Sequence, residues 1–142
     1  MNEKSAELRR IWNYFDGEPN VFLATVEGDQ PRVRPVTLVH LRENLYITTG
    51  SDNAKVKQME RNPKTELCLL LEEGERKGTL RAECTAQIVK DKKVKTDVFR
   101  NISFAKEFWE GPEDPSYTVI KLRPTAFEYM KPESTEATRI EM

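Results

Sequence analysis

The chain has 142 residues, of which 37% are hydrophobic and 33% are charged, and this length is enough for one domain with a sizeable core. Its 23 basic and 24 acidic residues give a net charge of −1, a balance that indicates neither a nucleic-acid partner nor an anionic membrane. No apolar run approaches the roughly 20 residues of a membrane-spanning helix, and the chain does not begin with an apolar signal segment, so we expect a cytoplasmic protein.

In chain order, the hydrophobic pattern predicts a helix, three strands, a short helix, two strands, a helical region and two closing strands. Turn residues separate most of these elements, and the fourth strand is so apolar that we expect it to be buried. The predicted ranges are 5–15, 21–26, 31–40, 45–49, 51–61, 65–71, 78–89, 91–109, 117–122 and 126–130.

About seven strands joined mostly by short turns favour a mainly β fold with a few helices. We expect an antiparallel barrel, because closing a sheet removes its exposed edges. We assign residues 1–130 to a single domain and residues 131–142 to a polar C-terminal tail that we expect to be loose.

Metal binding is not expected from the residue types. Cys68 and Cys84 have no CxxC partner, and His40 is the single histidine. A structural zinc site uses about four such ligands and a catalytic one about three. We therefore expect two reduced thiols in the core.

The first candidate site is an arginine-rich strand. Strand alternation puts Arg32, Arg34 and Val36 on one face. Pro35 cannot donate a hydrogen bond to a neighbouring strand, so it marks an edge or a bulge. The pattern alone is also compatible with an exposed strand face whose arginines are solvated.

A second candidate feature, a polar helix start, follows about one strand later. The first amides of a helix lack intrahelical partners and attract anions. Lys55 adds a full charge there, and further donors precede it at Ser51, Asn53, Thr48 and Thr49. An ordinary capped surface helix would show the same pattern, but the helix start and the arginine strand together predict a phosphate site.

Four segments, in this order and spacing, resemble the pyridoxamine 5′-phosphate oxidase-like family of flavin-binding split barrels. They are FLATV at 22–26, PRVRPV at 31–36, LYITT at 45–49 and KVKQMERNP at 55–63. A weaker likeness extends to 117–124 and 127–130, so that the resemblance covers most of residues 5–130. It implies a split β-barrel homodimer with FMN bound at the subunit interface.

The resemblance also implies roles for individual residues. Arg34 resembles the family's strand arginine on the phosphate, Arg32 a second one, and Lys55 the lysine of the following helix. The 36–37 backbone would lie along the flavin ring, and the hydroxyls at 48–49 near the phosphate and ribityl chain. The cofactor-binding residues that we expect are Arg32, Arg34, Val36, Thr37, Thr48, Thr49, Ser51, Asn53 and Lys55.

Two departures from the family pattern narrow the expected activity. In the oxidases that give the family its name, an arginine–histidine pair near the C-terminus contacts the vitamin substrate, but residues 131–142 contain no histidine. The resemblance therefore does not predict oxidation of pyridoxamine phosphate. Ala54 stands where an arginine is common, which weakens the expected hold on phosphate.

The leading hypothesis is an FMN-dependent oxidoreductase that acts on an unidentified small molecule, with hydride transfer through the flavin and a nicotinamide nucleotide as a candidate donor. The alternatives are a flavin-binding or stress-related protein without turnover, and a relative that binds a deazaflavin or haem. No Ser/His/Asp or Cys/His arrangement is recognisable, so no catalytic residue is assigned. We expect the aromatic residues Phe104, Phe108 and Trp109 to belong to the core.

Overall fold

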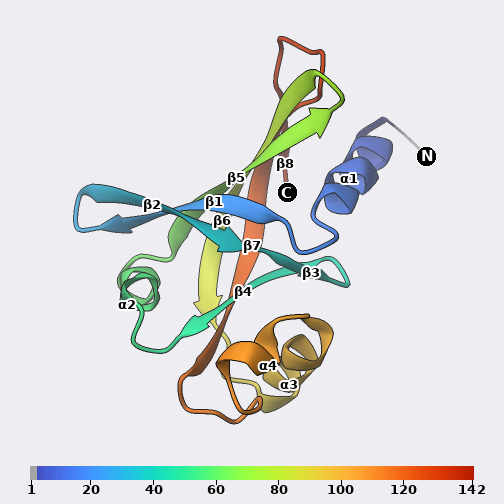
Figure 1. The fold of residues 1–142 in the computed structure, drawn as a ribbon. Helices are drawn as coiled ribbons and strands as arrows, with labels where there is room; N and C mark the ends of the chain where they lie inside the picture. Colours follow the sequence, from blue (N-terminus) through green and yellow to red (C-terminus); the bar gives the residue numbers. More distant parts are fainter. Residues whose placement is uncertain (1–2) are drawn as a thin grey trace.

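The computed structural model describes residues 3–142 as four helices and eight strands (Figure 1). No helix among these residues is long and apolar enough to span a membrane. The helices are α1 (Glu3–Tyr14), α2 (Ala54–Arg61), α3 (Lys92–Asn101) and α4 (Ala105–Phe108). The strands are β1 (Asn20–Glu27), β2 (Gln30–Thr37), β3 (Val39–Leu41), β4 (Asn44–Gly50), β5 (Lys64–Glu73), β6 (Arg76–Ile88), β7 (Tyr117–Met130) and β8 (Thr138–Glu141).

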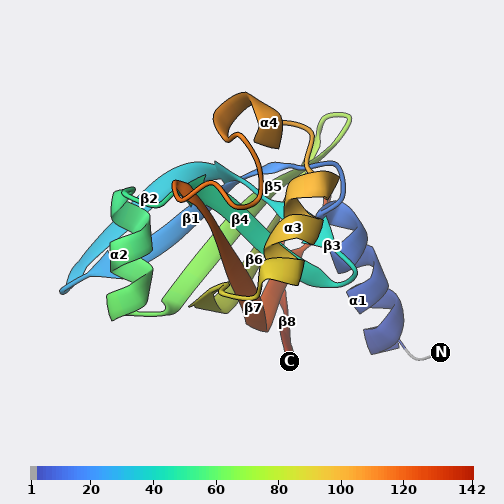
Figure 2. The ribbon, with the colours of Figure 1, turned by 90° about the horizontal axis from the view of Figure 1, so that it is seen from below.

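The strands form one antiparallel sheet in the order β2-β1-β5-β6-β7-β4-β3, with β8 paired to β7. The sheet curls until β2, at one end, contacts β4 near the other end. This arrangement is the split β-barrel that the sequence predicted. Helix α2 lies beside the β1–β2 hairpin, whereas α1 and α3 lie on the other side of the molecule in both views (Figure 2).

Two hydrophobic clusters hold these elements together. The larger fills the curl of the sheet, where Ile11 of α1 and Phe15, just after this helix, are both fully buried. The smaller lies between α3, α4 and the strands β4 and β7, and includes Val98, Trp109 and Tyr117. The second cluster packs α4 together with α3 against β4 and β7.

The structure corrects the prediction for the fourth strand. Along β5 the buried and less buried positions alternate, with Leu67 and Leu69 facing the core. Leu70 is 58% exposed and Cys68 is half-buried, so only one face of this apolar strand is covered. Cys84 is buried as expected.

The end of the chain also differs from the prediction. Residues 117–130 form the single strand β7, because a register shift in its pairing with β6 accommodates the proline. Pro124 pairs with Cys84 and Ala126 pairs with Glu83, so that Thr125 lies between the two paired positions. The tail is not loose throughout, because β8 pairs with β7 and buries Ile140. By contrast, the expected edge at Pro35 is confirmed, since β2 ends the sheet.

Replacing Gly78 by alanine should destabilise the fold. A Cβ at this position would collide with the carbonyl oxygen of Met130 and would lie 2.7 Å from the backbone nitrogen of Pro132. We expect the free energy of unfolding in urea to fall by about 1–3 kcal/mol, as for other overpacked sites. Gly111→Ala is the control, because nothing lies within 4 Å of its Cβ. Equal losses in both variants would contradict the expected clash.

Candidate functional site

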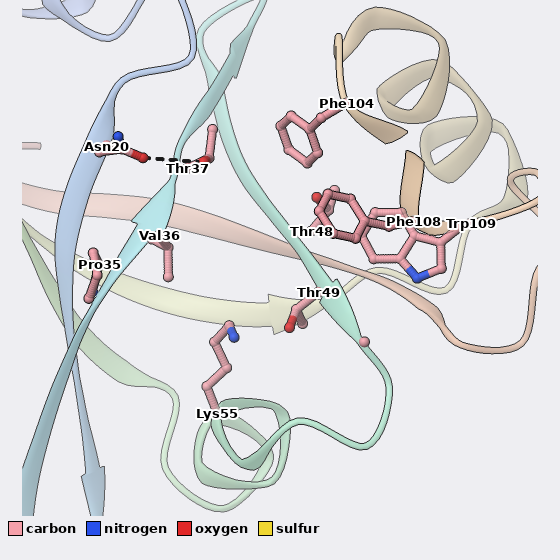
Figure 3. Close-up of a pocket in the computed structure, with 11 residues that line it drawn as sticks. Asn20, Pro35, Val36, Thr37, Thr48, Thr49, Lys55, Phe104, Phe108 and Trp109 are labelled. Carbon is pink, nitrogen blue, oxygen red and sulfur yellow. Dashed lines mark hydrogen bonds between the residues drawn. The ribbon is translucent and has the colours of Figure 1, made fainter. Parts of the chain in front are cut away.

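A cavity of about 770 Å³ opens between the end of β2, the end of β4, α2 and α4. Its volume is in the range of small-molecule sites, about 300–1,000 Å³. Figure 3 shows the β2 residues Pro35, Val36 and Thr37 on one side of the opening and the aromatic residues Phe104, Phe108 and Trp109, in and beside α4, on the other. The lining residues are Asn20, Pro35, Val36, Thr37, Thr48, Thr49, Gly50, Lys55, Phe104, Phe108 and Trp109.

Lys55 supplies the positive charge of this cavity. It stands in the first turn of α2, where the side chain of Asn53 caps the helix by accepting a hydrogen bond from the Lys55 backbone N–H at 3.2 Å. Its ammonium group projects toward the space between β2 and β4 (Figure 3). Burial lowers the pKa of Lys55, and the charge of Arg34 lowers it further. The cap therefore fixes the backbone while the side chain remains directed at the cavity.

Arg34 lies close to Lys55 but is held by neutral partners. Its Nη1 donates to the carbonyl oxygen of Leu23 at 3.1 Å, and its Nη2 donates to Oε1 of Gln58 at 2.7 Å. The hydroxyl of Thr25 donates to the same Gln58 oxygen at 2.6 Å. These bonds use two of the five guanidinium N–H groups. Burial lowers the pKa of Arg34, with a smaller contribution from the charge of Arg32.

Neither cation has an acidic partner among the residues that the structure describes. None of the ion pairs found within residues 3–142 includes Lys55 or Arg34, and no carboxylate lines the cavity. Two like charges thus lie beside one opening, and the charge of Arg34 lowers the pKa of Lys55. An anion entering the cavity would be attracted by both.

The end of β4 contributes hydroxyl groups. The Oγ1 atom of Thr48 is buried and has no hydrogen-bond partner within residues 3–142. The neighbouring Thr49 is itself buried and also lines the cavity. A buried polar atom without a partner costs free energy, so this strand end is suited to a polar ligand group.

The far side of the cavity is an aromatic wall, formed by Phe104, Phe108 and Trp109. Trp109 is 9% exposed and Phe104 is half-buried, in agreement with the predicted core role. Phe108 is 67% exposed, so the prediction is wrong for this residue. The rings of Phe104 and Phe108 are 6.2 Å apart at an interplanar angle of 78°.

The structure brings together only part of the predicted site. Five of the nine predicted residues line the cavity: Val36, Thr37, Thr48, Thr49 and Lys55. Arg34 lies next to the cavity, whereas Arg32 forms an exposed ion pair with Glu27 at 2.9 Å. Ser51 and Asn53 do not line it, because the Ser51 hydroxyl donates to the carbonyl oxygen of Pro115 and Asn53 caps α2.

The sequence reasoning missed Asn20, Pro35 and Gly50 as lining residues. Asn20 begins β1 opposite Thr37, whose hydroxyl donates to Oδ1 of Asn20 at 3.3 Å. The predicted hairpin could have identified this neighbour, because its register pairs the two positions. Phe108 gave no such signal, since its spacing is that of a core residue.

Comparison with known proteins agrees with this architecture. The family model described as Pyridoxamine 5′-phosphate oxidase matches residues 6–131. No curated protein gives a significant match. Among solved structures, General Stress Protein 26 from Bacillus anthracis is 25% identical with a TM-score of 0.74, and the alignment covers 96% of this chain and 99% of that one.

Two more distant structures show the same fold. A pyridoxamine 5′-phosphate oxidase-related, FMN-binding protein from Nostoc punctiforme is 14% identical with a TM-score of 0.70, covering 100% of this chain and 97% of that one. A haem-binding protein from Mycobacterium smegmatis is 13% identical with a TM-score of 0.78, covering 99% of this chain and 59% of that one. At these identities the likeness concerns the fold alone.

The coupling between the two cations predicts the effect of removing one of them. In Arg34→Gln, the pKa of Lys55 should rise toward its ordinary value, because a neighbouring positive charge no longer disfavours the protonated amine. An NMR titration of the Lys55 side chain measures this change. Arg32→Gln is the matched control and should leave this pKa unchanged, since Arg32 is paired with Glu27. An unchanged pKa in Arg34→Gln would show that the two charges are not coupled.

Proposed function

We propose that this chain, which belongs to the pyridoxamine 5′-phosphate oxidase-like family, is a flavoprotein that binds FMN in the cavity between β2, β4 and α4. The observation that carries the proposal is the pair formed by Lys55 and Arg34, two neighbouring cations that share no carboxylate within residues 3–142. A phosphate dianion would offset their repulsion and accept charge-assisted hydrogen bonds. A neutral ligand would leave the repulsion in place.

The donor set of the cavity fits the rest of this cofactor. Thr48 offers a buried hydroxyl that lacks a partner within residues 3–142, which suits the polyol chain that joins phosphate and ring. Val36 and Thr37 on β2 provide a surface along which a flat ring can lie (Figure 3). Since no carboxylate from residues 3–142 lines the cavity, the anionic cofactor would meet no like charge from this part of the chain.

The same lining favours flavin over haem. Haem iron is held in proteins by histidine, cysteine, methionine or tyrosine. None of these residue types lines the cavity in the described part of the chain. His40 is engaged elsewhere, with Nδ1 2.7 Å from Oδ1 of Asp16 and Nε2 accepting from the Glu43 backbone N–H at 3.1 Å.

Bound FMN would supply the hydride chemistry, so we propose an FMN-dependent oxidoreductase that acts on a small molecule. The chain's residues would bind and orient the cofactor and exclude water from its ring. A flavin-binding protein without turnover is the second candidate, because Lys55 is the one ionisable side chain lining the cavity within residues 3–142. Bleaching of the flavin absorbance by NADH or NADPH under anaerobic conditions would support the oxidoreductase and exclude the second candidate.

We also propose that two copies of the chain associate through an outer apolar patch, formed by Phe22, Val33, Pro35, Cys68 and Leu70. Strand register places Phe22 beside Pro35 on β2 and beside Cys68 on β5, and Phe22, Val33 and Leu70 are 47%, 68% and 58% exposed. Pro35 also lines the cavity, so a second copy on this patch would help to cover a bound ring. Burying these side chains would supply hydrophobic free energy for the homodimer.

Removing the cavity cation should weaken FMN binding selectively. We expect Lys55→Met to raise the dissociation constant for FMN by roughly tenfold to a hundredfold, the loss of one charge-assisted contact, and to leave that for riboflavin nearly unchanged. Flavin fluorescence titration measures both constants. Arg32→Met is the control and should bind FMN normally, because Arg32 does not line the cavity. Purified protein that takes up no FMN would refute the proposed function.

A charge placed in the outer apolar patch should separate the copies. We expect Leu70→Glu to shift the protein toward the monomer in sedimentation at micromolar concentration, because a carboxylate would be desolvated in the interface. Met142→Glu is the control, since Met142 is 56% exposed but lies outside the patch. A wild-type chain that sediments as a monomer with FMN bound would contradict the dimer.

A further inference from the structure

Phe108 presents an aromatic face to the cavity. It is 67% exposed, the second-largest exposed fraction among the exposed large hydrophobic residues of 3–142, and it lines the opening. The side chain is nevertheless placed by its neighbours, since its ring centroid is 6.2 Å from that of Phe104 and 5.7 Å from that of Trp109. Figure 3 shows these three rings together on the side of the cavity that faces β2.

The aromatic wall is anchored from behind. Trp109 is buried and its ring centroid is 5.0 Å from that of Tyr117, which is fully buried and contacts Phe99 edge-to-face at 5.4 Å. The hydroxyl of Tyr117 donates to the carbonyl oxygen of Lys95 at 3.0 Å. The rings therefore form a supported surface, with Phe108 as its exposed member.

Within residues 3–142, Lys55 is the one charged residue that lines the cavity, and the charged residues nearest the wall, Lys106, Glu107, Glu110 and Asp114, line a separate hollow behind Phe108 and Trp109. The polar side chains that line the cavity besides Lys55 are those of Asn20, Thr37, Thr48 and Thr49, which offer neutral amide and hydroxyl groups. Lys106 and Glu107 belong to the same helix as Phe108, but neither lines this cavity. A ligand that rests on the wall is therefore recognised by ring stacking and neutral polar groups.

We propose that the aromatic wall is the site of a second ligand, an uncharged planar ring that stacks on Phe108 opposite the flavin. The proposal rests on the proposed function, because FMN held at Lys55 and along Val36 and Thr37 occupies the strand side and leaves the wall side free. An exposed phenyl ring gains free energy when a second flat ring covers it. The substrate class is thus a neutral aromatic or quinonoid molecule.

The fluorescence of Trp109 provides a direct test. The chain has two tryptophans, so Trp12→Phe leaves Trp109 as the sole reporter. In this background, FMN-loaded protein is titrated with 1,4-naphthoquinone, and quenching gives a dissociation constant. We expect Phe108→Ala to weaken binding by about tenfold and Phe108→Tyr to retain it within about twofold, as for a stacking contact. Lys106→Ala, on the same helix but outside the cavity, is the control and should bind like the parent.

The proposal would be overturned by the absence of saturable quenching, or by an equal dissociation constant for naphthoquinone in Phe108→Ala and the parent. Release of FMN by the naphthoquinone would also overturn it, because the wall would then belong to the flavin site itself. The proposed function is judged separately, from FMN uptake in the flavin absorbance. If FMN is not taken up while ligand-free protein still binds naphthoquinone through Phe108, the wall is a ring site and the FMN assignment fails. If FMN binds but Phe108→Ala has no effect, FMN binding stands and the ring site fails.

Discussion

The side-chain amide oxygen of Gln58 holds Arg34 in place beside the cavity. Oε1 of Gln58 accepts hydrogen bonds from Thr25 on β1 and from Arg34 on β2, and so ties α2 to both strands of the hairpin. Thr25 and Gln58 are 2% and 6% exposed, and hydrogen bonds are strong in such a poorly solvated place. Because the acceptor is neutral, it orients the guanidinium without cancelling its charge. A glutamate in place of Gln58 would position Arg34 as well but would neutralise it, and the repulsion that lowers the pKa of Lys55 would largely disappear.

The fold followed from local patterns to a large extent. Alternation and turn residues predicted most strands within a few residues, and Pro35 predicted the edge at β2. Residues 31–40 proved to be two strands, because β2 ends at Thr37 and the chain crosses to the other end of the sheet as β3. The β8 pairing could not be read from the tail, since it depends on one buried side chain, Ile140, whose contacts lie in the core. Short polar segments are decided by such tertiary contacts rather than by their own composition.

Site residues could be predicted where the pattern of a single strand or helix start indicates them, as with Arg34 and Lys55. They could not be predicted where the side chain is hydrogen-bonded to a residue far along the chain. The hydroxyl of Ser51 is engaged by Pro115 and lies 2.7 Å from the Thr118 hydroxyl, more than sixty residues away. Helical spacing likewise cannot distinguish a core ring from one that lines a cavity. Trp109 turns inward to Tyr117, whereas Phe108, its neighbour in sequence, faces the opening.

The cap of α2 decides which chemistry could hold an anion here. A phosphate on a bare helix start is held by backbone amides, whose charge does not change with pH. In this chain the N–H of Lys55 is bonded to the side chain of Asn53, and the N–H of Val56 to the carbonyl oxygen of Asn53. An anion would therefore be attracted mainly by the Lys55 ammonium group. Burial and the charge of Arg34 lower the pKa of this group and so favour its neutral form. A bound dianion would stabilise the protonated amine and raise its pKa again, so proton uptake and phosphate binding are coupled at this residue. A bound anion would thus favour the state in which Lys55 and Arg34 are both charged.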